Sequence, residues 1–398
     1  MRPDRYHLGT PSVPFEARPG TTRRGKSPQV VRQGSGELAW KSLPARCEAP
    51  FTTTAKGGKQ MRKKGNSPSV IVGYGHAGRD LHHRALRDIT GGRSTVIAVD
   101  PRPAEVAGGE WVPDIRGAVT ALWAAGHRVA DAVFHVAVPP DAHRDCLEQL
   151  LHVGAQHFIL EKPIAHTVQE AAHLVDLAEA TGAVVLPMSV WPASRVTEAA
   201  EELVASGTIG EPVSYHMEQS KPRFRRSLQT QGHGSAFEVE LPHQLLLALH
   251  LAGPVAEVTG SRGWDLPLPA GRLARLGGAE VTLRHTSGVR TTLYTDLASP
   301  VRRRRLHIHG TEGTLVADYP VSGDDDFGQV RIAGRPVRKV VQDAPLTRFI
   351  EQAYAHFRGE APAPRSDLAL HLESMELLDT ARAAAFADSS TPAPQEAA

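Results

Sequence analysis

Lys162 is the side chain whose type and position most strongly suggest chemistry. It stands in Glu161-Lys162-Pro163, directly after the apolar run 156–160, which has the length and composition of a buried strand. A lysine that is partly desolvated near another cationic group has a lowered pKa and can take or give a hydroxyl proton. The other interpretation, a solvated lysine at a strand end, stays open on these residues alone.

His243 is the second candidate for proton transfer. The segment 237–243 leads into an apolar helix predicted over 245–251, so His243 falls at the start of that helix. There it could orient a substrate hydroxyl or act as an acid or base. Glu240 precedes it by three residues and could be its acidic partner. For both residues a purely structural role at a helix start stays open.

A glycine-rich turn lies at the start of the same half of the chain. The strand-like run 70–72 is followed by Gly73-Tyr74-Gly75-His76-Ala77-Gly78 and then by a helical pattern to about residue 89. Gly73 permits the tight turn, Gly75 lets the backbone approach a pyrophosphate, and Gly78 lets the helix pack on the strand. The helix N-terminus would then supply N–H groups to the phosphates. This context predicts a dinucleotide site.

Asp100 ends the next predicted strand, 95–99, and lies 22 residues after Gly78. A carboxylate there accepts hydrogen bonds from ribose hydroxyls and disfavours a 2′-phosphate, which favours NAD over NADP. Arg102 is the opposing signal, because an arginine two residues on could pair with that phosphate. NADP therefore stays open as the cofactor.

Strands and helices alternate through the rest of this half, which predicts a parallel sheet covered on both faces. The strand 132–138 ends at Val138-Pro139-Pro140, Asp141 is a candidate cap of the helix 142–152, and Thr167 with Glu170 forms a candidate capping box. A last strand is expected at 184–188. Ligands should bind where the glycine turn, residues 138–140 and residues 161–163 meet at the carboxyl ends of the strands.

Composition bounds the kind of protein. The 398 residues are 41% hydrophobic and 22% charged, and no apolar run is long enough for a transmembrane helix, so we expect a cytoplasmic protein without membrane contact. Cys47 and Cys146 do not form a disulfide or metal pattern, and no histidine spacing suggests a metal site. Residues 1–66 carry 14 Lys/Arg against 4 Asp/Glu, whereas the rest carries 31 against 39. The leader is predicted to be disordered, and nucleic acid is not expected as a partner.

With these pieces in order, the chain resembles the glucose–fructose oxidoreductase / inositol dehydrogenase (Gfo/Idh/MocA) family. The resemblance covers about residues 68–385 and rests on GYGHAG (73–78), VAVPPDAH (136–143), EKPIA (161–165), LVASGTIGEPV (203–213), ELPHQLLLALHLAG (240–253) and LHIHGTEGTLVADY (306–319). Residue 239 is valine where the family commonly has aspartate four residues before the histidine. Glu240 matches the Glu-x-x-His pattern of some relatives instead.

The resemblance implies a Rossmann doubly wound parallel sheet over 67–190. An α+β domain over 191–386 would follow, with a large, open, mostly antiparallel sheet, a C-terminal helix that packs back and a disordered tail over 387–398. It also implies that Lys162 lies beside a nicotinamide with a cis Lys-Pro peptide, and that the open sheet face mediates dimer or tetramer contacts. The implied cofactor contacts include His143 and Glu161, and the implied substrate pocket includes Trp191, Arg195 and His243.

The second half of the sequence agrees with this architecture. Strands are predicted at 212–219, 257–262, 279–284, 289–296, 305–309 and 330–332, with a hairpin at Ser287-Gly288, and helices at 346–357 and 368–386. The loop 219–234 contains Lys221, Arg223, Arg225 and Arg226 and is either a substrate lid or a solvated surface loop. The run 302–305 is interpreted as a charged strand start on the surface.

Two functions from different classes follow from the sequence. The first is an NAD(P)-dependent oxidoreductase that interconverts a secondary alcohol and a ketone on a small polyol or keto-sugar, such as a sugar, inositol, aminocyclitol or nucleotide sugar. The second is a non-catalytic dinucleotide-binding sensor on the same fold. The presence of both Lys162 and His243 favours the enzyme.

Overall fold

The structure is a computed structural model that describes residues 67–93, 95–229, 233–322 and 325–387. The predicted leader, residues 1–66, and nearly all of the predicted tail lie outside the described residues. Within the described part, no helix is long and apolar enough to cross a membrane.

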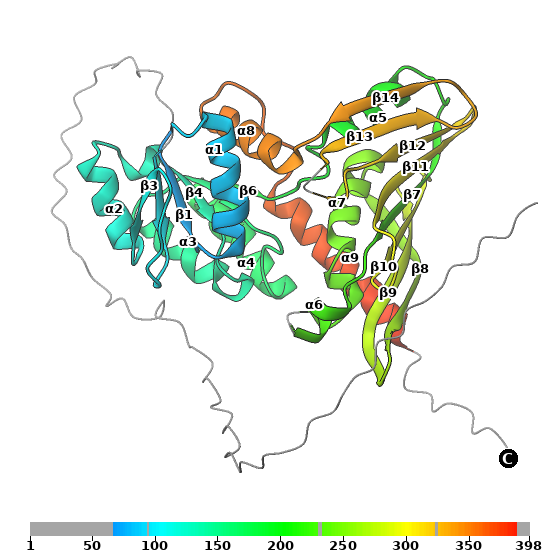
Figure 1. Ribbon diagram of the computed structural model, residues 1–398, viewed down its shortest axis with the longest axis horizontal. Helices are drawn as coiled ribbons and strands as arrows, with labels where there is room; N and C mark the ends of the chain where they lie inside the picture. Colours follow the sequence, from blue (N-terminus) through cyan, green and yellow to red (C-terminus); the bar gives the residue numbers. More distant parts are fainter. Residues whose placement is uncertain (1–66, 94, 230–232, 323–324, 388–398) are drawn as a thin grey trace, which may run out of the picture. The chain divides into compact units, whose positions relative to one another are not determined.

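A six-stranded, all-parallel sheet forms the first half (Figure 1), with the strand order β3-β2-β1-β4-β5-β6. The doubly wound sheet predicted from the sequence is therefore confirmed. All four residues of each of the three central strands β2, β1 and β4 are buried, as expected when helices cover both faces. The strands are β1 (Ser69–Val72), β2 (Val96–Val99), β3 (Gly109–Val112), β4 (Val133–Val136), β5 (His157–Leu160) and β6 (Val184–Pro187).

The helices that connect these strands begin close to the predicted positions, with two differences. The helix after the glycine turn starts as a π-helical segment, η1 (His76–His83), and continues as α1 (Arg84–Thr90). Asp141 is not a helix cap, because it lies inside the short 3-10 turn η3 (Pro140–Ala142) and α3 (His143–His152) follows Ala142. The remaining connections are α2 (Ile115–Ala124), the 3-10 turn η2 (Val129–Asp131) and α4 (Val168–Thr181).

The capping box predicted for α4 is present. The Thr167 hydroxyl accepts a hydrogen bond from the Glu170 N–H, and the Glu170 carboxylate accepts from the Thr167 N–H. These bonds satisfy two of the N–H groups that a helix start leaves without partners. Strand β3 and helix α2 are the elements of this half that the sequence analysis missed, and in β3 only Trp111 and Val112 of the four residues are large and apolar.

An eight-stranded sheet forms the second half, in the order β14-β13-β12-β11-β7-β10-β9-β8. All neighbouring pairs are antiparallel except β7 and β10, so the mostly antiparallel sheet is confirmed as well. Its strands are β7 (Pro212–Ser220), β8 (Val255–Leu268), β9 (Gly271–His285), β10 (Arg290–Asp296), β11 (Arg303–Gly310), β12 (Thr314–Asp318), β13 (Phe327–Ile332) and β14 (Arg338–Gln342).

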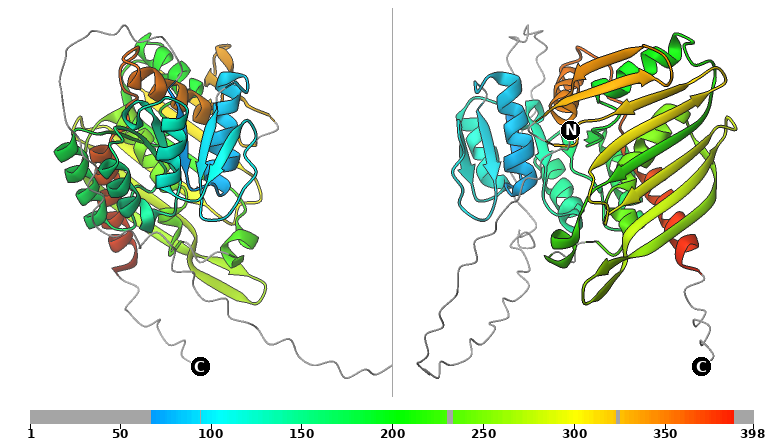
Figure 2. Two further views of the ribbon diagram at one scale, coloured as in Figure 1. Left: turned by 90° about the vertical axis from the view of Figure 1, so that its left-hand side faces the viewer. Right: turned by 45° about the vertical axis from the view of Figure 1, so that its right-hand side comes forward.

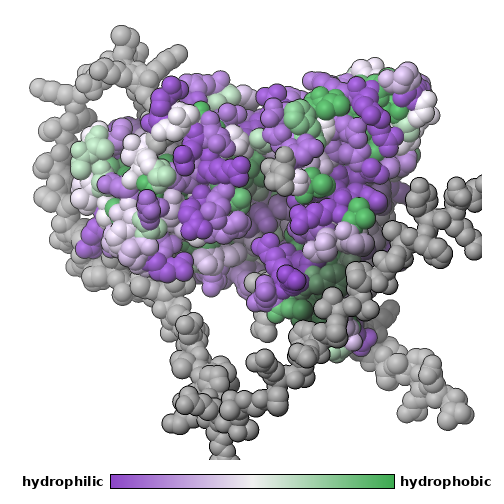
Figure 3. Space-filling model, viewed as in Figure 1, coloured by the Kyte–Doolittle hydropathy of each residue, from purple (hydrophilic) through white to green (hydrophobic). Residues whose placement is uncertain are grey.

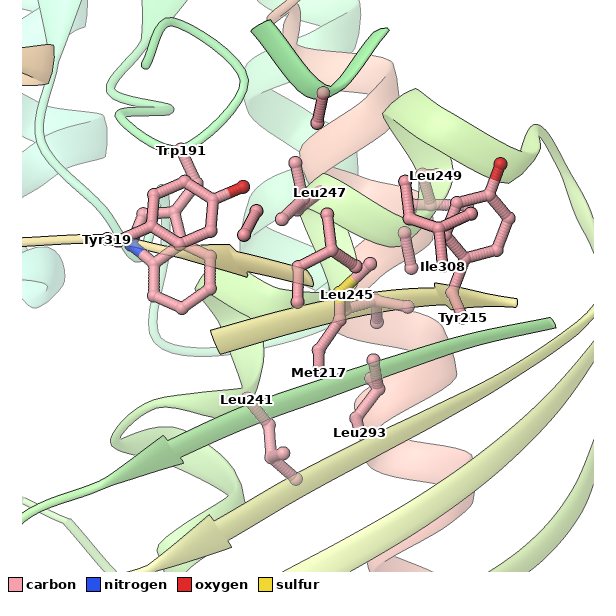
Figure 4. Packing of buried hydrophobic residues seen from close by; sticks show 14 of the residues in the cluster. Trp191, Tyr215, Met217, Leu241, Leu245, Leu247, Leu249, Leu293, Ile308 and Tyr319 are labelled. Carbon is pink, nitrogen blue, oxygen red and sulfur yellow. The ribbon is translucent and has the colours of Figure 1, made fainter. Parts of the chain in front are cut away.

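One face of this sheet is covered by helices, and Figure 2 (right) shows the other face open to the viewer. The helices of this half are α5 (Arg195–Ala205), α6 (Phe224–Gln229), the 3-10 turn η4 (Ala236–Glu238), α7 (Leu241–Ala252), α8 (Pro345–Phe357) and α9 (Leu368–Phe386). The core between sheet and helices joins Met217, Leu245, Leu293 and Ile308 (Figure 4). Hydrophilic side chains predominate on the molecular face drawn in Figure 3.

Helix α8 packs against the first sheet although it follows the second sheet in sequence. Its residues Phe349, Ile350, Ala353 and Tyr354 belong to the same buried cluster as Ile71 of β1. Helix α9 contacts α4 and β6 as well as α7 and β8. The last two helices of the chain therefore both contact the first half, and α9 contacts α7 as well.

Candidate active site

The three glycines of the turn have three different surroundings. A Cβ on Gly73 would lie 2.7 Å from the backbone of Ala137 and Val138, and φ there is +91°. A Cβ on Gly78 would lie 2.0 Å from the Gly73 carbonyl oxygen and 2.9 Å from Ile71 Cγ2. A Cβ on Gly75 would have no protein atom within 4 Å. Gly73 and Gly78 are thus required by the fold, whereas Gly75 leaves open space above the turn.

Open space at Gly75 is what a pyrophosphate needs in order to approach the backbone at a helix N-terminus. His76 and Ala77 are the next residues, at the start of η1, and the His76 ring is exposed and contacts Asp80 at 2.9 Å. The residues of the turn therefore fit a dinucleotide, which supplies a hydride acceptor or donor when it is bound.

Asp100 lies at the carboxyl end of β2 and is only 6% exposed. Its Oδ2 accepts a hydrogen bond of 3.0 Å from the Tyr74 N–H in the glycine turn, and its Oδ1 accepts one of 2.9 Å from the Arg102 N–H. The Arg102 side chain is largely exposed, with Nε 3.4 Å from the same Oδ1. The carboxylate is therefore fixed beside the turn, and the guanidinium is the more exposed of the two candidate groups.

Residues 138–143 and 161–164 come together at the carboxyl ends of β4 and β5. The Lys162-Pro163 bond is cis. The buried His143 ring lies 2.9 Å from the Ile164 carbonyl oxygen through Nδ1 and 3.0 Å from the Val138 carbonyl oxygen through Nε2. Both of its nitrogens face the backbone, so the contribution of His143 is to hold these two segments together. Pro139 and Pro140 form the more exposed rim of this edge.

Glu161 lies at one end of a buried chain of hydrogen-bonding groups. His82 Nε2 lies 2.9 Å from Glu161 Oε1, and His82 Nδ1 lies 2.7 Å from His135 Nδ1. His135 Nε2 lies 2.9 Å from the Tyr354 hydroxyl, which lies 2.6 Å from Ser69 Oγ. The chain thus runs from the residue before Lys162, across the sheet, to α8.

This chain determines the charge of Glu161. Burial alone would raise the pKa of Glu161, but the interaction with His82 and the charge of Lys162 bring it below its usual value. Glu161 also accepts a 3.1 Å bond from the Lys162 N–H. The carboxylate is therefore ionised and fixed next to Lys162.

The charge of Lys162 acts on the His243 ring. Burial holds the pKa of His243 well below its usual value, and the positive charges of Lys162, Arg304 and Lys221 lower it further. No hydrogen bond joins the His243 ring to any residue in the described ranges, although its side chain is only partly exposed. A neutral imidazole with free ring nitrogens can accept a proton from a substrate hydroxyl. The joint action of Lys162 and His243 on one substrate hydroxyl stays a prediction.

Glu240 is placed differently from what its spacing to His243 predicts. It is buried, accepts a hydrogen bond from the Gln219 side chain and forms an ion pair with Lys221. Among the described residues it has no hydrogen bond to His243. Its role as the partner of His243 therefore stays a prediction that the present contacts do not support.

Trp191 and Arg195 are separated by the fold. Trp191 is buried, and its ring lies nearly parallel to that of His243, with the ring centroids 6.4 Å apart. It also stacks on Tyr319, with the ring centroids 5.1 Å apart (Figure 4). It therefore supports the His243 ring. Arg195 is exposed at the start of α5, where its N–H donates to Asp343 Oδ1 at 2.9 Å, and its charge is not among those that act on His243.

Sequence reasoning missed several residues of this site. Arg304 was assigned to a surface run, but its side chain is mostly buried, donates to the Pro320 carbonyl oxygen at 3.1 Å and faces Glu240. His82 and His135 were not singled out, although a histidine inside the apolar run 132–138 signals a buried polar partner. His233 lies near Lys162 and Arg223, whose charges lower its pKa in addition to burial. In the described residues no cluster of three or more His, Cys, Asp or Glu could hold a metal ion.

Two family profiles match the chain. The one described as "Oxidoreductase family, NAD-binding Rossmann fold" matches residues 68–189, and the one described as "GFO/IDH/MocA C-terminal domain" matches residues 197–316. Together they cover more than half of the 398 residues. No curated protein sequence matches the chain.

Solved structures share the fold at low sequence identity. A UDP-N-acetylglucosamine 3-dehydrogenase from Acidithiobacillus ferrooxidans is 19% identical with a TM-score of 0.59, over 81% of this chain and 98% of that one. A 3-ketoreductase from Actinomadura kijaniata, in complex with TDP-benzene and NADP, is 16% identical with a TM-score of 0.63, over 80% and 98%. An oxidoreductase from Agrobacterium radiobacter, with NAD+, L-tartaric acid and magnesium, is 17% identical with a TM-score of 0.64, over 82% and 97%.

The matched segments coincide with the two sheets, and the glycine turn fits a dinucleotide pyrophosphate. On these grounds the chain belongs to the Gfo/Idh/MocA family of oxidoreductases with an NAD-binding Rossmann fold.

Proposed function

We propose that this protein is an NAD(P)-dependent dehydrogenase or reductase that interconverts a secondary alcohol and a ketone on a sugar, inositol or aminocyclitol type of substrate. Lys162 and His243 are the acid/base or orienting groups of this proposal. The observation that carries it is that Lys162 follows β5 at the same edge of the parallel sheet as the glycine turn after β1, where Gly75 leaves open space for a dinucleotide.

Each group has a task that its surroundings support. In the oxidation direction the substrate carbon loses hydride, its hydroxyl oxygen loses a proton, and the C=O bond forms. The proton passes to a ring nitrogen of His243, whose imidazole the lowered pKa keeps neutral, or to Lys162 Nζ when the lysine is in its neutral amine form. Gly73, Gly75 and Gly78 would hold the pyrophosphate, and Asp100 would bind the ribose hydroxyls, which favours NAD.

The substrate class is supported by relatives of the same fold. The names of two of them refer to a nucleotide-sugar dehydrogenase and a 3-ketoreductase. Both names describe the interconversion of a ring hydroxyl and a ketone. We extend that class of reaction to this chain and leave the individual sugar to experiment.

The test is NADH binding followed by turnover. We expect NADH fluorescence to change on binding, and we expect reduction of NAD+ with at least one member of a panel of inositols, sugars, aminocyclitols and nucleotide sugars. Binding without turnover on any member, in either direction, would instead support a dinucleotide-binding sensor. Absence of NADH and NADPH binding would contradict both functions.

We also propose that the chain forms a dimer or tetramer through the open face of the eight-stranded sheet. That face carries His216 of β7 and His307 of β11, whose rings are 6.1 Å apart and which are only partly exposed. Light scattering after size exclusion should give a multiple of the 42.8 kDa chain mass. A mass of one chain at micromolar concentration would contradict this proposal.

A further inference from the structure

A strongly cationic pocket lies in the second half of the protein, at the end of β7. Its volume is about 530 Å³, and the ionisable residues that line it are all basic: Lys221, Arg223, Arg225, Arg226 and Arg302. Four of these follow β7 directly, and Arg302 precedes β11, which pairs with β7. The pocket is thus built at the end of two adjacent strands of the second sheet.

One guanidinium in this pocket is buried without a partner. Arg223 is only 7% exposed, and in the described ranges no hydrogen bond or ion pair reaches its side chain. Burial and the nearby charge of Arg226 lower the pKa of Arg223 from its usual value. A buried charge without a counter-ion is costly, so a group of opposite charge is expected in the completed site.

The balance of charges around Arg223 also indicates that a negatively charged group is missing from the pocket. Glu240 is the acidic residue whose charge acts on Lys221, Arg223 and Arg304, and it already pairs with Lys221. Three buried or half-buried cations therefore share one carboxylate, and Arg302 repels Arg304 further. The described residues leave an excess of about two positive charges here, before Arg225 and Arg302 are counted.

The cationic cluster continues to the reacting groups. Arg304 and Lys221 lower the pKa of His243 together with Lys162, and Arg223 acts on His233 together with Lys162. Lys221 lines the pocket and pairs with Glu240, the N-cap residue of α7, and His243 lies in the first turn of that helix. The pocket is thus connected to His243 through the start of α7.

We propose that this pocket binds the phosphate groups of an organic phosphate substrate, either a sugar phosphate or a nucleotide sugar, whose sugar ring extends toward Lys162 and His243. The proposal rests on the proposed oxidoreductase function and specifies its substrate class. A phosphate or diphosphate carries about two negative charges and matches the excess, whereas a single carboxylate leaves one cation unpaired. Arginine also binds phosphate oxygens bidentately.

The experiment is a calorimetric titration of the NADH-saturated protein, because bound NADH keeps added nucleotides from the glycine turn. The probes are UDP, glucose 6-phosphate and, as an uncharged comparison, glucose. We expect at least one phosphate probe to bind and glucose to bind far more weakly. Tighter binding of UDP than of glucose 6-phosphate assigns the pocket to a nucleotide sugar, and the reverse order assigns it to a sugar phosphate.

Substitutions of the pocket arginines test whether the phosphate probes bind in this pocket. Arg223→Gln should weaken the better phosphate probe by about 10- to 100-fold, the range expected for hydrogen bonds to a charged group. Arg302→Gln, on the exposed rim, should weaken binding of the same probe by a smaller factor. It also provides a test of the pocket if Arg223→Gln does not fold. Arg290→Gln is the matched control. Arg290 is exposed at the start of β10, whereas the pocket lies beyond the other end of the neighbouring strand β7. The variant should bind the phosphate probe with the affinity of the wild type.

Two results would overturn the proposal: no binding of either phosphate probe to the folded holoprotein, or equal binding by wild type, Arg223→Gln and Arg302→Gln. Failure of the oxidoreductase function would appear separately, as phosphate binding without turnover. Lys162→Ala should retain phosphate binding while it loses turnover, which separates the two proposals in one variant.

Discussion

The Nδ1 atoms of His82 and His135 lie 2.7 Å apart in the interior of the nucleotide-binding half, so one ring must donate a proton to the other. With both rings neutral, one arrangement satisfies the whole chain: Ser69 donates to Tyr354, Tyr354 to His135, His135 to His82 and His82 to Glu161. Every donor then points toward Glu161. The carboxylate before Lys162 is thus the acceptor at the end of a chain that begins in the first residue of β1.

Breaking this chain should destabilise the protein. His135→Phe keeps a ring in the buried position but leaves His82 Nδ1 without its partner and removes the acceptor of Tyr354. We expect the free energy of unfolding in urea to fall by about 1–3 kcal/mol, the cost of an unpaired buried polar group. Tyr354→Phe is the milder comparison, because Ser69 and His135 each lose one bond but the His82–His135 contact is kept. Equal stability of His135→Phe and wild type would show that the chain is not energetically important.

Buried histidines should make the fold sensitive to acid. Burial lowers the pKa of His371 to about 3, whereas an unfolded chain has a histidine pKa of about 6.5. Between these values the unfolded state binds more protons than the folded state. The contribution of the neutral His371 to the free energy of unfolding is therefore complete above about pH 6.5 and is lost as the pH falls toward 3. His371→Gln should therefore lower the pH dependence of the unfolding free energy at pH 5 by about 1.4 kcal/mol per pH unit. The exposed His166→Gln serves as the control; the same loss of slope in that variant would contradict the assignment.

Gly75→Val should abolish dinucleotide binding and leave the fold intact. The added side chain meets no protein atom and instead enters the space that the pyrophosphate needs. Titration of NADH fluorescence should show no binding, while the thermal midpoint stays within a few degrees of wild type. Gly78→Val is the contrasting variant, because its Cβ would collide with the Gly73 carbonyl oxygen and should lower the thermal midpoint. Unchanged NADH affinity in Gly75→Val would refute the assignment of this turn.

Asp100 should set the choice between NAD and NADP. We expect the wild type to prefer NAD in kcat/KM, and Asp100→Ala to narrow or reverse that preference because the carboxylate repels a 2′-phosphate. Since Asp100 also accepts the Tyr74 and Arg102 N–H groups, the variant should lose some stability as well. Arg102→Ala should weaken the binding of NADP and leave the binding of NAD unchanged. A wild type that clearly prefers NADP would mean that Arg102 outweighs Asp100.

Lys162 and His243 should matter for turnover more than for cofactor affinity. A general acid or base contributes roughly 10²–10⁴-fold to the rate, so Lys162→Ala should lower kcat by about that factor with little change in NADH affinity. His243→Ala should do the same, or less if it only orients the substrate. The limb of the pH–rate profile that belongs to a removed group should disappear. Near wild-type kcat in Lys162→Ala would make Lys162 a structural residue.

Periodicity and turn chemistry were sufficient to predict most of the fold. The run Val70-Ile71-Val72, the glycine turn and the Thr167 capping box are local signals, and each lies where the sequence places it. Strand β3 was missed because Gly109 and Glu110 give it no apolar pattern, and its position is decided by pairing with β2. Tertiary pairing of this kind is not visible in a local window.

The site was harder to predict because its charges are paired across the fold. Glu240 is three residues from His243, yet its carboxylate binds Lys221 and Gln219 of the loop and strand before it. Arg304 stands among three other arginines, and only the packing of β11 against β7 distinguishes the buried one. Such pairings depend on contacts between segments that lie far apart in the sequence, and no spacing rule encodes them.

Helix α8 gives the nucleotide-binding half a contribution from the far end of the polypeptide. Because Tyr354 completes the bonds of Ser69 and His135, a fragment that stops near residue 190 would leave these groups without their partner. The first half therefore depends on α8 for part of its buried core and for these two hydrogen bonds. A chimaera that exchanges it for the corresponding half of a relative must transplant residues 345–357 as well, so that gene fusions made at a single breakpoint should yield insoluble protein.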